Sequence, residues 1–266
     1  MKKLAKILIG VLAFTSCYLN ILGPVKVPIA HASLSQILPL SQTTLSTDAN
    51  LVSYWPLNGN SNDTKGSNSG TDTSMSYSAS SPPNANFGQH AVFNGTTSQI
   101  EKTTAVGMGS GANAFTYMGL MQTSVTGTRT MVNYGNFSTC NSRGIIVLSG
   151  TPGKLYFAGQ SCDVGPGATS LTDGTWHYIA VTFDGTTVKI YVDGSSDATS
   201  GTPALNITGT KFRLGNDNSV AQNAFFSGNL IDWSFFSRAL SATEISNHWT
   251  GADALPSGNA MFFGGD

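Results

Sequence analysis

The most constraining feature of the sequence is a pair of apolar, β-branched segments on either side of an Asp-Gly step. The segment Trp176–Phe183 meets Asp184-Gly185, and the chain returns as Val188–Val192. An Asp-Gly step between such segments is typical of a β-hairpin, because both residues tolerate positive φ. In the returning segment, alternate residues are apolar and share one face, which predicts one buried and one wetter face. The sequence therefore predicts antiparallel β-structure here.

Most of the chain repeats this pattern of short apolar runs separated by turn residues. The 30 Gly residues, with abundant Ser, Thr and Asn, favour many short strands joined by tight turns. Runs of this kind occur at Leu51–Trp55, Ala91–Phe93, Phe115–Tyr117 and Thr128–Asn133. We therefore predict an all-β fold.

One helix is predicted near the C-terminus. Ser241-Ala-Thr-Glu244 has the pattern of a capping box, in which the hydroxyl and the carboxylate satisfy free N–H groups at a helix start. The helix is expected to run through Ile245 to His248 and to end near Gly251. Residues 251–266 are Gly-rich and are expected to form a flexible tail.

The first 32 residues have the order of a secretory signal peptide. Lys2, Lys3 and Lys6 precede an apolar run, and Ala30-His31-Ala32 fits a small-x-small cleavage site. A retained membrane anchor and a lipoprotein, with Cys17 in a poor lipobox, are the alternatives. We expect a secreted or cell-surface protein, with a membrane contact only through an uncleaved signal or a lipid anchor. Residues 33–48 show no periodicity and are expected to be a linker.

Removal of the leader leaves two cysteines, Cys140 and Cys162. An even number in an exported chain indicates a disulfide. A hairpin formed by residues 145–148 and 154–157 brings both cysteines to its open end. A metal or redox pair is the alternative, but a CxxC spacing and a nearby His are lacking.

The charge balance argues against one class of partner. The formal net charge is -1 and charged residues make up 10% of the chain. Proteins that bind nucleic acids electrostatically need clustered Lys and Arg to release counterions from the phosphates. We therefore expect no nucleic-acid partner.

An ordered set of motifs resembles the laminin-G-like (concanavalin A-like) jelly rolls of bacterial surface and secreted proteins. The motifs are Leu51–Asn60 with Asp63, Phe93-Asn-Gly95, Gly174–Gly185 with Ile190–Gly194, Phe212–Gly215, Phe226-Ser-Gly228, and Ser237–Ser241 with Glu244. The resemblance implies an antiparallel two-sheet jelly-roll sandwich over residues 49–250. Two positions depart from the family pattern: Leu120 replaces a usual Trp, and Ile231 replaces a usual acidic residue.

Because related sandwiches include glycosidases, catalysis needs separate consideration. Glycoside hydrolysis requires two carboxyl groups facing each other across the scissile bond. The chain has two Glu residues, Glu101 and Glu244, and the second is assigned to the helix cap. His177 shares a strand face with apolar residues and is expected to be structural. We therefore expect a protein that is not an enzyme.

The resemblance also implies a calcium ion held on a loop, since many members of the family bind one through hard oxygen ligands. Asn62, Asp63 and Asn68 in the first loop supply such groups, and Asp232 is expected to approach from the final strand. An ordinary Asx-rich turn is the alternative.

Sugar binding would use exposed aromatic rings, and the candidates are Tyr134, Tyr156, Tyr191 and Trp233. The expected function is a secreted or surface-displayed binding module for a carbohydrate or an extracellular protein. A structural or adhesive surface component is the second hypothesis, and a glycosidase-like enzyme is the third.

Overall fold

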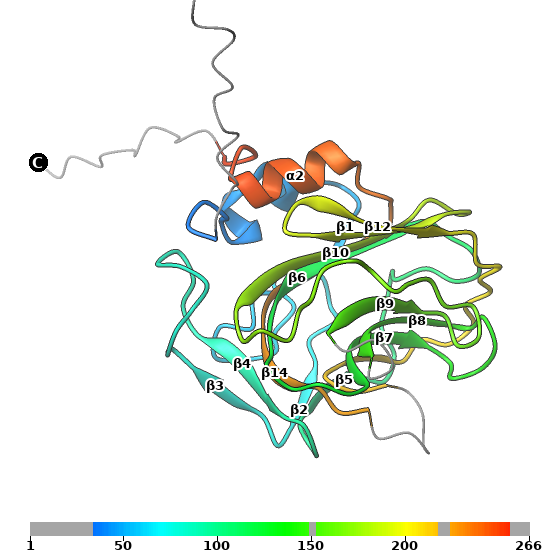
Figure 1. The fold of residues 1–266 in the computed structure, drawn as a ribbon, viewed down its shortest axis with the longest axis horizontal. Helices are drawn as coiled ribbons and strands as arrows, with labels where there is room; N and C mark the ends of the chain where they lie inside the picture. Colours follow the sequence, from blue (N-terminus) through cyan, green and yellow to red (C-terminus); the bar gives the residue numbers. More distant parts are fainter. Residues whose placement is uncertain (1–33, 149–152, 218–223, 256–266) are drawn as a thin grey trace, which may run out of the picture. The chain divides into compact units, whose positions relative to one another are not determined.

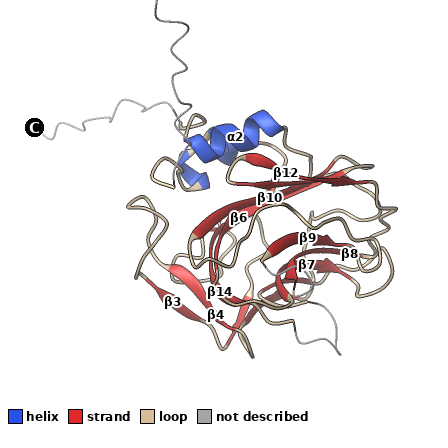
Figure 2. Ribbon diagram, viewed as in Figure 1, coloured by secondary structure: helices blue, strands red, loops and turns tan. Residues whose placement is uncertain are grey.

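The computed structural model describes residues 34–148, 153–217 and 224–255. The signal-peptide prediction and most of the predicted tail lie outside these residues. Within them, two antiparallel β-sheets and one α-helix are present (Figure 1, Figure 2). The predicted all-β, two-sheet jelly-roll sandwich is confirmed.

The larger sheet has eight strands in the order β12-β11-β10-β6-β14-β4-β3, with β1 also pairing with β14. Its strands are β1 (Leu51–Trp55), β3 (Ser76–Ser78), β4 (His90–Asn94), β6 (Phe115–Gln122), β10 (Trp176–Phe183), β11 (Val188–Val192), β12 (Ser195–Gly201) and β14 (Ser227–Phe236). The predicted hairpin is β10–β11, with Phe183 opposite Val188. Asp184 accepts backbone N–H groups of Thr186 and Thr187 and so closes the turn.

The smaller sheet has six strands in the order β2-β5-β13-β7-β8-β9. Its strands are β2 (Thr71–Thr73), β5 (Gln99–Lys102), β7 (Arg129–Gly135), β8 (Ser142–Leu148), β9 (Lys154–Ala158) and β13 (Phe212–Leu214). Apolar side chains from the inner faces of both sheets form the main core, because alternate strand residues point to opposite faces. The core also encloses the fully buried Arg143, whose guanidinium lies 4.6 Å from the ring centroid of Phe115.

The helix α2 (Ala242–Thr250) lies against the outer face of the eight-stranded sheet (Figure 1). Its N-cap Ser241 and Glu244 form the predicted capping box, and Gly251 ends the helix in the left-handed conformation. The Arg238 guanidinium lowers the pKa of Glu244 to about 2, against the opposing effect of burial. Glu244 is therefore a structural carboxylate, as predicted.

The linker predicted at residues 33–48 is, from residue 34 on, part of the folded unit. Two short 3₁₀ helices, η1 (Leu40–Gln42) and η2 (Thr44–Thr47), lie here. Ile37 and Leu40 are fully buried in a second apolar cluster on the outer face of the eight-stranded sheet. Apolar side chains on irregular turns bury surface without any periodicity, so the pattern alone could not indicate this packing. We call residues 34–48 the N-terminal strap.

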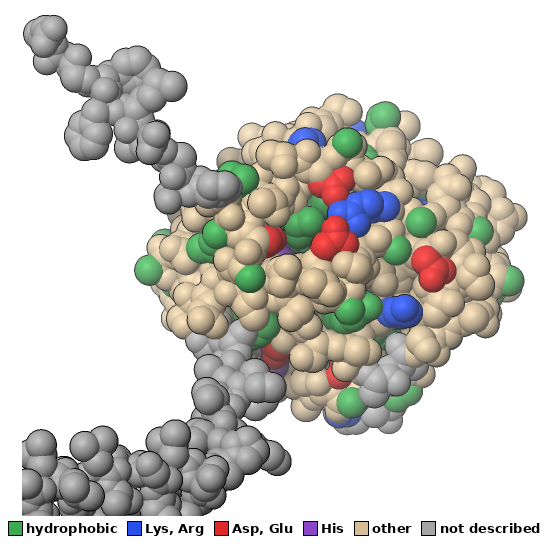
Figure 3. Space-filling model, turned by 90° about the horizontal axis from the view of Figure 1, so that it is seen from above, with side chains coloured by type: hydrophobic (Ala, Val, Ile, Leu, Met, Phe, Trp, Pro, Cys, Tyr) green, Lys and Arg blue, Asp and Glu red, His purple; other side chains and the backbone are tan. Residues whose placement is uncertain are grey.

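The start of the predicted tail also belongs to the folded unit. Ala254 forms a β-bridge with Thr43 of the strap, and the Leu255 N–H donates to the Gln42 carbonyl. The strap and α2 together cover the outer face of the eight-stranded sheet. Seen from the side of α2, the surface is mostly uncharged, with charged side chains in small groups (Figure 3).

Candidate functional site

The six-stranded sheet presents a polar outer face, in contrast to the covered eight-stranded sheet. A row of residues crosses this face in register: Glu101 pairs with Arg213, Arg213 with Asn133, Asn133 with Gly144, and Gly144 with Ala158. The row changes from charged to amide to small residues along its length. The last two residues leave space above the sheet.

A pocket of about 280 Å³ lies over the small-residue end of this row. Its floor comprises Thr130, Asn133, Ser142 and Ala158. Loop residues form its rim, namely Phe137, Gln160, Asp163 and Asp217. Polar groups that converge in a hollow can fix the orientation of a small ligand.

Gly144 keeps the pocket open because it has no side chain. A Cβ at this position would lie 3.1 Å from the Cβ and the carbonyl oxygen of Ala158 and 3.2 Å from Nδ2 of Asn133. These contacts are closer than side chains normally allow, so a larger residue would both fill the hollow and displace the Asn133 amide.

Asn133 is held in a fixed orientation by one hydrogen bond. Its Nδ2 donates to Ser142 Oγ at 2.9 Å, while its Oδ1 has no partner among the described residues. The residue is 3% exposed. A buried acceptor without a donor costs free energy, so a bound hydroxyl or water that supplies a proton here is stabilised.

The charged end of the row is internally neutralised. Arg213 contacts Oε2 of Glu101 at 2.6 Å through Nε and through Nη2, and its Nη1 donates to the Asp217 carbonyl oxygen. Burial raises the pKa of Glu101, but Arg213 and Lys211 outweigh that effect and hold it below its usual range. Glu101 is thus an ionised partner of Arg213, and so is unsuited to be a general acid.

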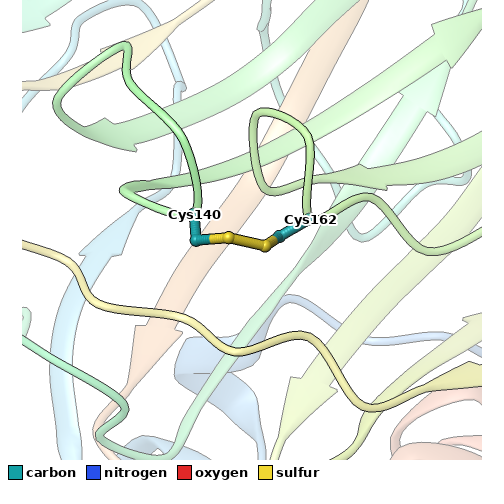
Figure 4. Close-up of a disulfide and its surroundings, with 2 residues drawn as sticks. All are labelled: Cys140 and Cys162. Carbon is teal, nitrogen blue, oxygen red and sulfur yellow. A yellow bond between two sulfur atoms is a disulfide. The ribbon is translucent and has the colours of Figure 1, made fainter.

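The predicted disulfide between Cys140 and Cys162 is present, with a Cα–Cα distance of 5.0 Å. It joins the loop after β7 to the loop after β9 (Figure 4). Phe137 lies on the first of these loops, and Gln160 and Asp163 lie on the second. The disulfide therefore holds together two parts of the pocket rim.

Three of the four aromatic residues predicted to bind sugar are buried. Tyr134, Tyr191 and Trp233 are 2%, 4% and 1% exposed, so they cannot offer a ring face to a ligand. Trp233 packs over Gly119, where a Cβ would lie 2.5 Å from the ring. Tyr156 is half-buried on β9, and its ring packs against Gly165. The alternation along each strand shows which residues share a face of the sheet, but it does not show which face is buried in the core.

The four predicted calcium ligands do not form a common donor set. Asp63 accepts the backbone N–H groups of Tyr54, Lys65, Gly66 and Asn68. The Asn68 amide is occupied by Ser53 and by both backbone groups of Val106. Asn62 is exposed. Asp63 and Asn68 therefore organise the first loop, as an Asx-rich turn does.

Asp232 has a different role, in anchoring the strap. Its carboxylate accepts the Leu40 N–H and the Tyr54 hydroxyl, and burial raises its pKa to about 6. It lines a second pocket, of about 420 Å³, between the strap and β1. Among the described residues, no three or more His, Cys, Asp or Glu side chains are grouped as a metal site. The residues present do not fit the predicted calcium ion.

His177 has the structural role that was predicted. Its Nδ1 lies 2.9 Å from an Asp193 carboxylate oxygen and its Nε2 lies 3.3 Å from Asp173. Burial lowers the pKa of His177, but the two carboxylates outweigh that effect and raise it.

Sequence reasoning missed the pocket floor. Residues 129–135 were recognised in part as a strand, and the alternation Val132, Asn133, Tyr134 placed Asn133 on the face opposite the apolar residues. That alternation was the available signal. The partners of Asn133 across the sheet come from distant segments, so the sequence did not reveal that they meet.

The comparisons with known proteins give a family and a fold. The sequence model described as the concanavalin A-like lectin/glucanases superfamily matches residues 94–246, more than half of the chain. No curated protein matches the chain.

Several solved structures are similar. Domain 4 of AbnA, a GH43 extracellular arabinanase from Geobacillus stearothermophilus, solved in complex with arabinotriose, has a TM-score of 0.58 and 20% identity, over 74% of this chain and 97% of that one. The binding domain of Paraclostridial Mosquitocidal Protein 1 has a TM-score of 0.55 and 13% identity, over 75% and 52%. Trypanosoma rangeli sialidase has a TM-score of 0.56 and 14% identity, over 84% and 37%. The chain thus spans about half of the mosquitocidal-protein domain and 37% of the sialidase, and at these identities the likeness shows the fold.

No helix among the described residues has the length and apolar character needed to cross a membrane.

Proposed function

This chain belongs to the concanavalin A-like lectin/glucanases superfamily, and on that premise we propose that it is an exported, non-catalytic module that binds a glycan on the outer face of its six-stranded sheet. The pocket over Asn133 is the observation that carries the proposal. It combines a low floor, fixed polar groups and an aromatic rim residue, which together suit a hydroxyl-rich ligand.

The non-catalytic part of the proposal rests on the two Glu residues. Glu101 is paired with Arg213, and Glu244 caps α2. Neither is placed opposite a second carboxyl group across a cleft, which is the arrangement that glycoside hydrolysis needs. The arabinanase domain in complex with arabinotriose supports a glycan as the ligand class.

Export is supported by the sequence of residues 1–32 and by the Cys140–Cys162 disulfide. Disulfides persist in oxidising compartments outside the cytoplasm. We propose a secreted or cell-surface location on this basis. An extracellular protein is the other partner class that the same face can accept.

The proposal is tested by a glycan array with the purified protein, followed by titration of each hit. Replacing Phe137 by Ala removes the aromatic rim and is expected to weaken binding at least about tenfold, equivalent to 1.4 kcal/mol. Lys189→Ala is the matched control, because Lys189 is exposed on β11 of the other sheet. Equal effects of the two variants would place the glycan elsewhere. A protein that binds no glycan would favour the structural-component hypothesis.

A further inference from the structure

The pocket over Asn133 has an uneven distribution of charge. Its described lining includes two carboxylates, Asp163 and Asp217, and neither Lys nor Arg. Asp163 is exposed and makes no hydrogen bond or ion pair with the described residues.

The nearest cation in the strand register, Arg213, does not offset this negative charge. Its guanidinium is engaged by the Glu101 carboxylate and by the Asp217 carbonyl oxygen. Its side chain is 14% exposed, so little of the guanidinium can reach a ligand. An incoming anion therefore meets the exposed Asp163 carboxylate, and the lining residues described for this pocket include neither Lys nor Arg.

The hydrogen-bonding groups of the pocket also favour a neutral ligand over an anionic one. Asn133 Oδ1 is an acceptor without a donor among the described residues, and the Asp163 carboxylate at the rim offers further acceptor oxygens. A neutral sugar brings hydroxyl donors to such groups. A uronic acid, a sialic acid or a sulfated sugar brings further acceptors and a negative charge, so it is disfavoured by both mismatches.

From this distribution we propose that the pocket is selective for neutral glycans and discriminates against anionic ones. The inference rests on the proposed function, because it names the ligand class of the same site. It adds a role for Asp163 as a specificity-determining residue at the rim.

The test compares neutral and anionic oligosaccharides matched in size, titrated into the full protein at low salt and in the presence of a chelator. Galactose- and arabinose-based oligosaccharides serve as neutral probes, and sialylated and galacturonic-acid oligosaccharides as anionic probes. We expect the anionic probes to bind at least about tenfold more weakly, and salt to narrow the difference by screening.

The variant Asp163→Asn then tests the effect of the Asp163 charge alone, because it removes the negative charge and keeps the size of the side chain. It is expected to strengthen binding of the anionic probes severalfold while leaving the affinity for neutral probes nearly unchanged. Asp184→Asn is the matched control, because it makes the same charge change in the β10–β11 turn and keeps an oxygen acceptor for Thr186 and Thr187. Equal effects of the two variants would show that net charge, rather than the rim, sets the preference.

The outcomes separate this inference from the proposed function. Tighter binding of anionic probes would overturn the selectivity and leave glycan binding intact. Binding of neither set would overturn both. Discrimination against the anionic probes that stays unchanged in Asp163→Asn would contradict the role given to the rim.

Discussion

Cys140 and Cys162 are bonded across the open end of the β8–β9 hairpin, so that one covalent link fixes two loops of the pocket rim. Phe137 precedes one cysteine in its loop, and Gln160 and Asp163 flank the other. The sheets themselves are held by backbone pairing and by the apolar core. The disulfide therefore acts most directly on the pocket.

Removing the disulfide is expected to weaken ligand binding as well as stability. For a bridge with a sequence separation of 22 residues, the loop-entropy model gives a loss of about 3 kcal/mol in the free energy of unfolding. The double variant Cys140→Ser, Cys162→Ser should remain folded at 25 °C and bind the glycan several-fold more weakly. Denaturant unfolding and calorimetric titration measure the two effects. An unchanged affinity in the folded variant would show that the loops are positioned without the bridge.

Filling the hollow is expected to block binding without unfolding the protein. Ala158 points outward from β9 and is half-buried in the pocket floor, so Leu at this position occupies ligand space rather than core space. We expect Ala158→Leu to abolish measurable glycan binding and to change Tm little. Ala252→Leu, an exposed position after α2, is the control. Retained binding in Ala158→Leu would remove this pocket from consideration.

Features formed by residues close together in the sequence could be predicted from it, whereas features formed by distant segments could not. The β10–β11 hairpin and the Ser241–Glu244 capping box are local, and both were predicted correctly. The row from Glu101 to Ala158 joins strands from distant parts of the chain, and its register depends on the whole sandwich. No local pattern carries that information.

Two of the predicted sugar-binding aromatics, Tyr191 on β11 and Trp233 on β14, lie in the eight-stranded sheet. Alternation along a strand shows that two faces differ, but both faces of the eight-stranded sheet are buried, one by the main core and the other by the strap and α2. Tyr191 faces the strap cluster, whereas Trp233 faces the main core. Tyr134, on β7 of the six-stranded sheet, also points into the main core. A sheet covered on both faces leaves its aromatic residues no exposed side.

Calcium removal is expected to have no effect on stability. The carboxylate oxygens of Asp63 accept the backbone N–H groups of Tyr54 and Asn68, and Oδ1 of Asn68 accepts the backbone N–H of Val106. A metal bound only by the folded state would raise Tm through mass action. We therefore expect the same Tm by calorimetry with excess chelator and with added calcium. A rise in Tm with calcium would reinstate the predicted site.

Truncating the strap core is expected to destabilise the whole domain. Leu40 is fully buried, and its N–H is bound by the buried Asp232 carboxylate. Leu40→Ala should cost about 2–5 kcal/mol in the free energy of unfolding, the usual range for a buried leucine. Thr44→Ala, at an exposed position of the same strap, should cost less than about 0.5 kcal/mol. Equal, small effects in denaturant titrations would indicate that the strap is the linker that was predicted.

The stabilisation from His177 is expected to decrease as the pH rises. The carboxylates of Asp193 and Asp173 raise the pKa of this histidine in the folded protein despite its burial. The folded state therefore holds the proton more tightly than the unfolded state, whose pKa is about 6.5. The contribution is complete below that value and is lost as the pH rises through the folded pKa. The gap in unfolding free energy between the wild type and His177→Gln should thus be larger at pH 6 than at pH 9. Because both proteins share every other titrating group, a gap that stays constant would contradict the ion pairs assigned to His177.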